Sequence, residues 1–176
     1  MPHNTSPLKF RLRYIILPLA LLVLTIVIAA IFYGQLPSEV HYRFGLDGDP
    51  SGNPVSKAAL FGSLMAVQIV LLVIAYFTVR TIGSVQLFRD NINNFWFSPT
   101  RLLTIMGNMP TIIQLIMGYV LIDAIIYALQ GNHLMPLWLF TVIALAGGGI
   151  VLIIYALPVV LQAYRGFNSY QEKKKE

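Results

Sequence analysis

Long apolar stretches without charge are separated by short polar segments along the chain, and this pattern predicts membrane-spanning helices. The first stretch, 14–33, has 20 residues and begins directly after Arg13. At 1.5 Å of rise per residue, 20 residues cross a hydrocarbon core of about 30 Å. Three further stretches follow at 58–79, 102–129 and 137–162. We therefore predict an all-α integral membrane protein, a four-helix bundle.

Turn-forming and helix-capping residues lie at the boundaries of these stretches. The segment 130–136 contains Gly, Asn and Pro and divides the last two stretches, which together are too long for one helix. Ser56 is placed to cap the second helix, and Ser98, followed by Pro99, to cap the third. The first stretch exceeds the apolar core of a signal peptide, about 7–15 residues, and no small-residue cleavage site follows, so we expect an uncleaved helix.

The basic residues are distributed unevenly between the two sides of this arrangement. With both termini in the cytoplasm, ten of the twelve Lys and Arg residues lie in cytoplasmic segments. These ten are Lys9, Arg11, Arg13, Arg80, Arg89, Arg101, Arg165, Lys173, Lys174 and Lys175. Only Arg43 and Lys57 lie on the outer side. Such a positive-inside bias predicts that both termini are cytoplasmic.

This arrangement divides the chain into four parts. A first helix pair with an outer loop at 34–57 occupies residues 1–79, and a cytoplasmic connector occupies 80–101. A second helix pair occupies 102–164, and a basic cytoplasmic tail occupies 165–176. In the connector, apolar residues recur every three or four positions, which predicts either a short helix on the inner leaflet or an ordinary loop. The apolar positions are Val85, Phe88, Ile92, Phe95 and Trp96.

The composition narrows the classes of function. Of the 176 residues, 57% are hydrophobic and 11% are charged, whereas globular domains carry about 25% charged residues. The chain has no cysteine, which excludes disulfides, thiolate metal sites and iron–sulfur clusters. Membrane orientation explains the net charge of +5, so no nucleic-acid partner is expected. Metalloprotease, serine hydrolase and P-loop motifs are missing and the three histidines are dispersed, so we expect neither catalysis nor a cofactor.

One ionisable side chain, Asp123, lies within a predicted span, six residues from its outer end. It either snorkels to the outer interface or bonds a neighbouring group, which together we favour, or it serves an ion pathway. Gln68 and Gln114 lie deeper and are expected to form hydrogen bonds with other helices. Pro110 and Pro158 are expected to bend their helices. The glycines at 147–149 either allow close helix contact, the default interpretation, or provide a flexible break.

The outer loop has a more specific sequence than a connector requires. Residues 40–44 favour extended structure and the run 45–54 is rich in turn formers, so we expect a short hairpin or a compact cap. Gly48 and Gly52 in that run are candidates for positive φ angles. Residues 47–52 match the first half of a calcium loop, but Ala58 stands where the second half requires glutamate, so no metal site is expected.

Taken whole, the loop resembles the signature of a bacterial membrane domain of unknown function that is also found at the N-terminal end of SdpI-type immunity proteins. In that pattern a Leu-Pro pair follows the first helix, and an extended piece ending in Phe, an Asp-Gly-x-Pro turn and a Ser-Lys pair precede the second. The matching positions are Leu36, Pro37, Phe44, Asp47, Gly48, Pro50, Ser56 and Lys57. Where many members have His-Phe, this chain has Arg43-Phe44. The resemblance covers roughly residues 14–75 and implies a multi-pass protein of the bacterial inner membrane, without implying toxin immunity directly.

Two hypotheses of function follow. In the first, the chain is a non-enzymatic accessory, sensory or immunity-like protein that engages another membrane protein or an extracytoplasmic peptide through its outer loop. The candidate binding residues are Arg43, Phe44, Asp47, Gly48, Pro50 and Lys57. The alternative is a small transporter or channel subunit that uses Asp123, with Gln68 and Gln114 beside it. Membrane lipid is an expected partner in both cases, and self-association into a homo-oligomer is left open.

Overall fold

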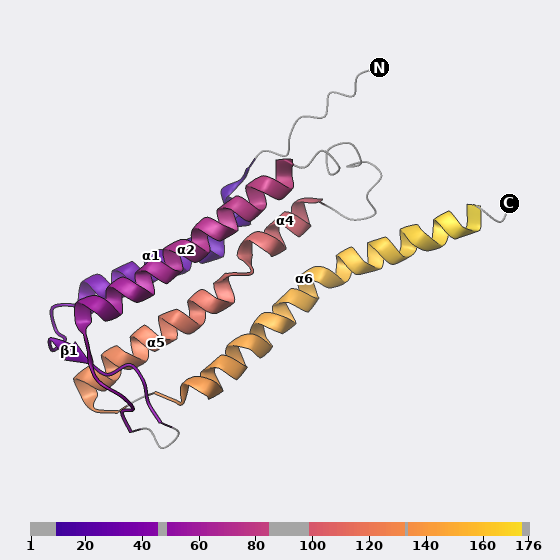
Figure 1. Ribbon diagram of the computed structural model, residues 1–176. Helices are drawn as coiled ribbons and strands as arrows, with labels where there is room; N and C mark the ends of the chain where they lie inside the picture. The colour runs from indigo at the N-terminus through magenta and orange to yellow at the C-terminus, as the bar shows by residue number, and fades with distance from the viewer. Residues whose placement is uncertain (1–9, 46–48, 85–98, 133, 174–176) are drawn as a thin grey trace.

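The computed structural model describes residues 10–45, 49–84, 99–132 and 134–173, and this part of the chain is mostly helical (Figure 1). The helices are η1 (Leu12–Tyr14), α1 (Ile16–Phe32), α2 (Lys57–Ser84), α4 (Pro99–Asn108), α5 (Thr111–Gln130) and α6 (Leu137–Lys173). Two short strands, β1 (Glu39–Val40) and β2 (Val55–Ser56), lie between α1 and α2. The predicted surface helix at 85–96 lies outside the described residues.

The helices run alongside one another in a long assembly (Figure 1). α1 contacts α2 and α5, and α2 also contacts α4 and α5. α6 contacts α5 and α4, and its C-terminal part continues beyond them. The two strands close the end of the assembly where α1 ends and α2 begins, which we call the loop end. α6 runs from the loop end to the opposite end and extends past it.

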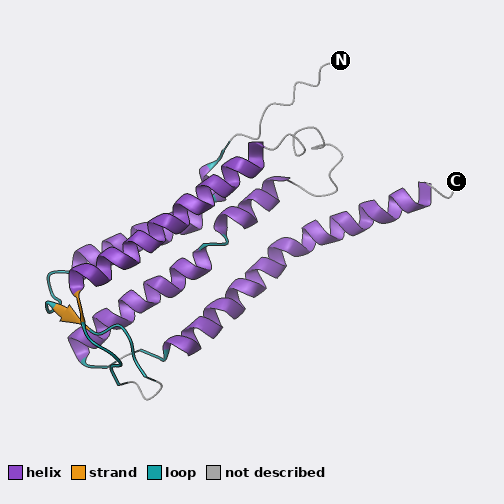
Figure 2. Cartoon of the chain, in the orientation of Figure 1, coloured by secondary structure: helices purple, strands orange, loops and turns teal. Residues whose placement is uncertain are grey.

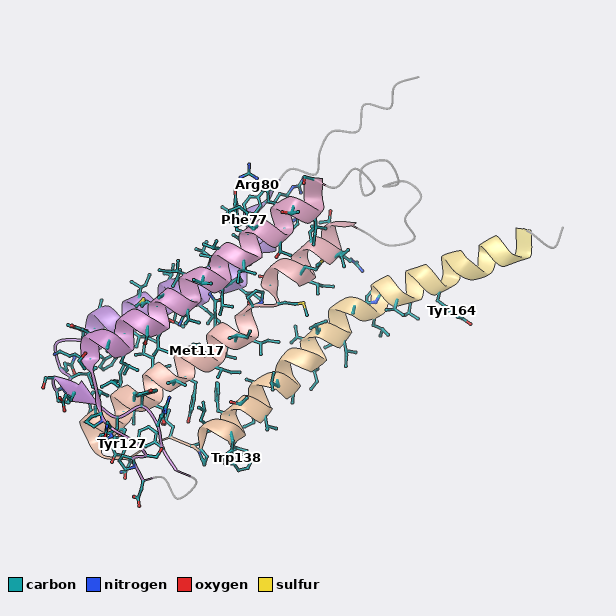
Figure 3. All side chains as sticks on the ribbon, viewed as in Figure 1. Phe77, Arg80, Met117, Tyr127, Trp138 and Tyr164 are labelled. Atoms are coloured by element: carbon teal, nitrogen blue, oxygen red, sulfur yellow. The ribbon has the colours of Figure 1, made fainter. Side chains whose placement is uncertain are left out.

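Three helical segments are long and apolar enough to cross a membrane. They are α2, the α4–α5 pair counted over 100–130, and α6 as far as Pro158. α1 is apolar but shorter, with 17 residues and about 26 Å of rise. Large apolar side chains cover the outer faces of these helices, including Phe77, which is 57% exposed, and Trp138 (Figure 3). A continuous apolar exterior of this kind suits lipid and not water.

The third predicted helix, 102–129, is two helices instead of one. α4 ends at Asn108 and α5 begins at Thr111, so the break falls at Pro110, where the sequence predicts a bend. Proline has no N–H to donate to the carbonyl four residues earlier, and the helical ladder is interrupted there. Gly131 ends α5 with a φ of 74°, in the segment predicted to separate the last two helices.

Buried apolar side chains form two clusters, one toward each end of the assembly. The cluster at the loop end comprises Ala29, Leu36, Val40, Leu60, Phe61, Leu64, Leu121, Ala124 and Ile125. The cluster at the opposite end comprises Tyr14, Ile15, Ala75, Val79 and Leu103. Gly107 of α4 lies against this second cluster, where a Cβ would lie 2.6 Å from Val79 Cγ2 and would also collide with the Tyr14 carbonyl oxygen. A glycine is needed at 107 because α4 approaches the η1 backbone so closely.

α6 meets the rest of the assembly at a second glycine. A Cβ at Gly148 would lie 2.8 Å from Cγ1 of Ile112 on α5. The default interpretation of the glycine run, close helix contact, is therefore confirmed at Gly148, whereas Gly147 and Gly149 have open space around them.

Side chains cap the first turns of two helices. Asn108 Oδ1 accepts a hydrogen bond from Leu17 N at 3.1 Å, so the end of α4 satisfies an amide at the start of α1. Ser56 Oγ accepts a hydrogen bond from Ala59 N at 3.2 Å, which confirms the predicted cap of the second helix.

Candidate functional site

The outer loop contains a short β-hairpin, one of the two forms that its sequence predicts (Figure 2). β1 and β2 are antiparallel, with Val40 opposite Val55. Further along the loop, Phe44 is bridged to Pro50, and Ser51 N donates to the Arg43 carbonyl oxygen at 2.9 Å. Gly52 has a φ of 88°, which agrees with its predicted conformation. The tip of the hairpin, with the candidate residues Asp47 and Gly48, lies outside the described residues.

Lys57 anchors this hairpin to the end of α1. Its Nζ donates to the carbonyl oxygens of Tyr33 at 3.2 Å and Leu36 at 3.0 Å, and it lies 4.9 Å from the centroid of the Tyr33 ring. Carbonyls at a helix C-terminus lack partners within the helix, and an ammonium group satisfies them well. Lys57 is a candidate binding residue by sequence, but the structure shows its ammonium group holding the loop in place.

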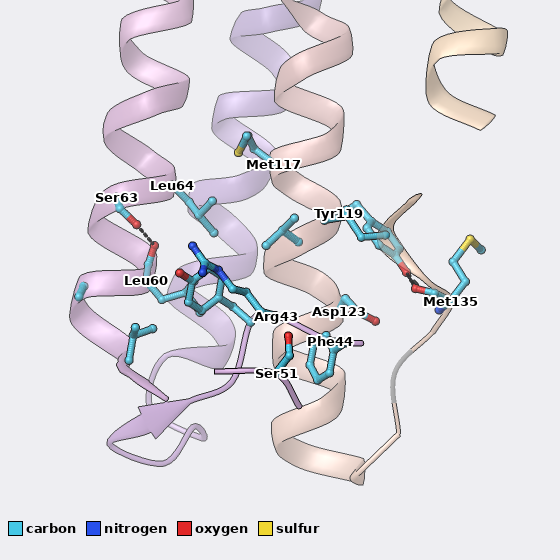
Figure 4. Close-up of a pocket in the computed structure, with 15 residues that line it drawn as sticks. Arg43, Phe44, Ser51, Leu60, Ser63, Leu64, Met117, Tyr119, Asp123 and Met135 are labelled. Atoms are coloured by element: carbon cyan, nitrogen blue, oxygen red, sulfur yellow. Dashed lines mark hydrogen bonds between the residues drawn. The ribbon is translucent and has the colours of Figure 1, made fainter. Parts of the chain in front are cut away.

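A pocket of about 590 Å³ lies between the hairpin, α2, α5 and the start of α6 (Figure 4). Its lining is mainly apolar and aromatic, with one basic and one acidic side chain. The lining residues are Tyr42, Arg43, Phe44, Ser51, Val55, Ala59, Leu60, Ser63, Leu64, Met117, Tyr119, Val120, Asp123, Met135 and Leu137. The volume falls within the range of about 300–1,000 Å³ that is usual for small-molecule sites.

Arg43 supplies the positive charge of the pocket. Its side chain extends from the hairpin into the pocket (Figure 4) and is exposed. Its guanidinium group lies 5.3 Å from the centroid of the Tyr42 ring. The guanidinium N–H groups of Arg43 are of the donor type that suits an anionic or carbonyl group of a ligand.

Asp123 lies on the opposite wall of the pocket and is 5% exposed. Its Oδ1 accepts a hydrogen bond from Leu134 N at 2.8 Å. One turn earlier on α5, the Tyr119 hydroxyl donates to Met135 O at 2.6 Å and accepts from Met135 N at 3.1 Å. We call these side chains and the backbone of Leu134 and Met135 the α5–α6 latch. The favoured interpretation of Asp123, a bond to a neighbouring group, is confirmed.

The latch also connects the pocket to α6. The Tyr119 ring stacks on Phe140 of α6 at a centroid distance of 3.9 Å and an interplanar angle of 10°. Met135 and Leu137 both line the pocket, so the entry into α6 is one of its walls. Tyr119 was not singled out from the sequence. Its position four residues before Asp123, on the same helix face, is the signal that points to it.

Gln68 and Gln114 lie deeper in the assembly and do not line the pocket. Gln68 Nε2 donates to Thr25 Oγ1 at 3.1 Å, and Gln114 Nε2 donates to the Gln68 carbonyl oxygen at 3.0 Å. The predicted hydrogen bonds to other helices are therefore present and link α1, α2 and α5. The three residues considered for transport therefore lie in two places. Asp123 lines the pocket, whereas Gln68 and Gln114 lie farther from the loop end.

Of the candidate binding residues, Arg43 and Phe44 line the pocket. The Phe44 ring also packs on Tyr127 of α5 at a centroid distance of 4.7 Å, and Pro50 shapes the hairpin through its bridge to Phe44. Among the described residues there is no group of three or more His, Cys, Asp or Glu placed to hold a metal ion. Comparisons of the chain with protein families, with curated proteins and with solved structures give no match.

Proposed function

We propose that this chain is a four-span protein of the bacterial inner membrane that acts as a non-enzymatic accessory, sensory or immunity-like protein. In this proposal the pocket at the loop end faces the outside of the cell and binds a segment of an extracytoplasmic peptide or of a membrane partner. The observation that carries it is the pocket itself, where the exposed side chain of Arg43 lies over an apolar floor.

The proposed topology takes α1, α2, the α4–α5 pair and α6 as the four spans. α1 lies beside α2 and α5, and its 17 residues are at the lower limit of about 17–25 for a span. The excess of Lys and Arg in the segments assigned to the cytoplasm supports cytoplasmic termini and an outer hairpin.

The chemistry of the pocket suits a ligand with an apolar body and an acidic or carbonyl group. Leu60, Leu64, Met117 and Val120 provide the apolar surface, which drives burial of the body. Arg43 offers a fork of N–H donors that matches a carboxylate or a carbonyl oxygen. A hydrophobic peptide end has both parts.

The latch supports a sensory role. A ligand in the pocket contacts the wall formed by Met135 and Leu137 and so contacts the start of α6. Tyr119 and Asp123 hold that wall by three hydrogen bonds. A ligand that favours one position of the wall shifts the position of α6, because binding energy selects between the available conformations.

Site-specific photocrosslinking in native membranes tests this function. A benzophenone amino acid in place of Phe44 puts the probe in the pocket, and the same residue in place of the exposed Phe77 on α2 is the control (Figure 3). We expect one adduct from position 44 that is missing from position 77. Arg43→Gln should reduce its yield about tenfold, since a charge-assisted hydrogen bond contributes about 1.5–3 kcal/mol. The same adducts from both positions, or a yield that Arg43→Gln leaves unchanged, would contradict the proposal.

A second candidate function, a small transporter, is favoured by one observation. Asp123 lies at the pocket, and the buried side-chain oxygens of Gln68 and Gln114, deeper in the protein, have no hydrogen-bond partner among the described residues. Asp123→Asn removes the charge but keeps an oxygen that accepts the Leu134 N–H. Loss of proton or cation flux in reconstituted vesicles with this variant, at unchanged adduct yield from position 44, would support transport. Unchanged flux would rule out the transporter function.

A further inference from the structure

A buried polar cluster lies at the contact of α1, α2 and α5. Thr25, Gln68 and Gln114 are 4%, 0% and 1% exposed, and they are joined by the hydrogen bonds already described. The Thr25 hydroxyl donates onward to the Leu21 carbonyl oxygen at 2.9 Å. Each of these three side chains therefore donates one hydrogen bond to a protein acceptor.

Two acceptors in this cluster lack a donor. Among the buried side-chain atoms that the structure describes, Oε1 of Gln68 and Oε1 of Gln114 have no hydrogen-bond partner. The other such atom is Thr111 Oγ1, three residues before Gln114 on α5. Buried polar atoms are almost always bonded to protein or to ordered water, and an unbonded carbonyl among apolar helices is costly.

We propose that Thr25, Gln68 and Gln114 form a binding site for an ordered water molecule within the helix assembly. Water supplies O–H donors of the kind that the unbonded amide oxygens require, and a buried water needs two to four polar partners. A metal cation fits less well, because the cluster offers only neutral oxygens. The nearest acidic residue along α5 is Asp123, nine residues and about 13 Å of helical rise from Gln114.

The outer pocket lies next to this site along α2 and α5. Leu64 lies one turn before Gln68 on α2, and Met117 lies one turn after Gln114 on α5. Both Leu64 and Met117 line the pocket, so their side chains separate it from the polar cluster. Gly118 leaves additional space beside the cluster, since a Cβ there would meet only Thr25 Oγ1, at 3.9 Å.

Solid-state NMR of the protein in phospholipid bilayers tests the site, with water itself as the probe. Magnetisation transfer from water to side-chain amides is measured after nitrogen labelling of glutamine, and to backbone amides after uniform labelling. We expect the side chains of Gln68 and Gln114 to receive magnetisation as early as exposed Gln35 does, while the backbone amide of fully buried Ala124 does not. If the side chains of Gln68 and Gln114 receive no more magnetisation from water than the backbone amide of Ala124, the proposal is overturned.

Two variants show whether the water belongs to this cluster. Gln114→Met removes one of its partners and should abolish the transfer to Gln68. Leu115→Met changes the neighbouring exposed position and should leave the transfer intact. Transfer to Gln68 that survives Gln114→Met would place the water elsewhere and refute the assignment. The measurement on the unsubstituted protein decides the proposal even where Gln114→Met does not fold, and it is independent of what the outer pocket binds.

Discussion

Replacement of Tyr119 by phenylalanine removes one hydroxyl group from the α5–α6 latch and leaves the aromatic ring in place. That hydroxyl donates to Met135 O at 2.6 Å and accepts from Met135 N at 3.1 Å, so Tyr119→Phe removes both bonds to the Met135 backbone. The stacking on Phe140 and the bond from Leu134 N to Asp123 remain. The substitution therefore loosens the wall of the pocket without creating a large cavity.

The size of the effect follows from the number of bonds lost. A neutral hydrogen bond contributes about 0.5–1.5 kcal/mol net, so two such bonds correspond to about 1–3 kcal/mol in the free energy of opening the latch. At 1.4 kcal/mol for each factor of ten, the population of the open latch rises between about 5-fold and 150-fold. The helices themselves keep their packing, so the global free energy of unfolding changes less than the local one.

Hydrogen–deuterium exchange at the amides of Leu134 and Met135 measures this opening in detergent or nanodiscs. We expect faster exchange at both amides in Tyr119→Phe and unchanged exchange elsewhere on α5. Tyr127→Phe is the matched control, because this residue is on the same helix and its ring packs on Phe44 outside the latch. Exchange in Tyr119→Phe that equals that of the control would show that the hydroxyl does not hold the wall, and the reasoning on the latch would be wrong.

Three further substitutions test other contacts. Gly107→Ala should lower the free energy of unfolding by about 1–3 kcal/mol, because the added methyl group meets a backbone carbonyl of η1. Gly62→Ala on α2 should raise the free energy of unfolding by up to about 1 kcal/mol, because position 62 has open space around it. Thermal unfolding compares the two, and equal effects would contradict the close approach of α4. Lys57→Met should weaken the attachment of the hairpin to α1 by about 1–2 kcal/mol, seen as faster exchange at 33–36 with helix content retained, and unchanged exchange there would refute the anchor. Asp123→Ala should speed exchange at Leu134 while Asp123→Asn, which keeps an acceptor oxygen, should not; equal acceleration would show that the charge matters and not the acceptor.

The sequence by itself predicts the apolar helical stretches and the turns that separate them, and it predicts the hairpin as one of two forms of the outer loop. The apolar runs predict the helices because length and polarity are properties of consecutive residues. Gly131 and Ser56 lie at helix boundaries for local reasons, a left-handed backbone at one and a hydroxyl cap at the other. Pro110 predicts a disturbance of the helix for the same kind of reason, although whether it bends or breaks the helix depends on what packs around it.

Only the tertiary structure decides which side chains meet. Arg43 and Asp123 are 80 residues apart in the sequence, and they line one pocket because α5 packs beside the hairpin. Lys57 is a candidate binding residue by its charge, yet its ammonium group donates hydrogen bonds to the carbonyl oxygens after α1. A polar residue within an apolar span predicts a hydrogen bond to another helix, but helix packing decides which group is the partner. Gln114 Nε2 therefore donates to the Gln68 carbonyl oxygen, and the side-chain amide oxygens of both residues have no donor among the described residues.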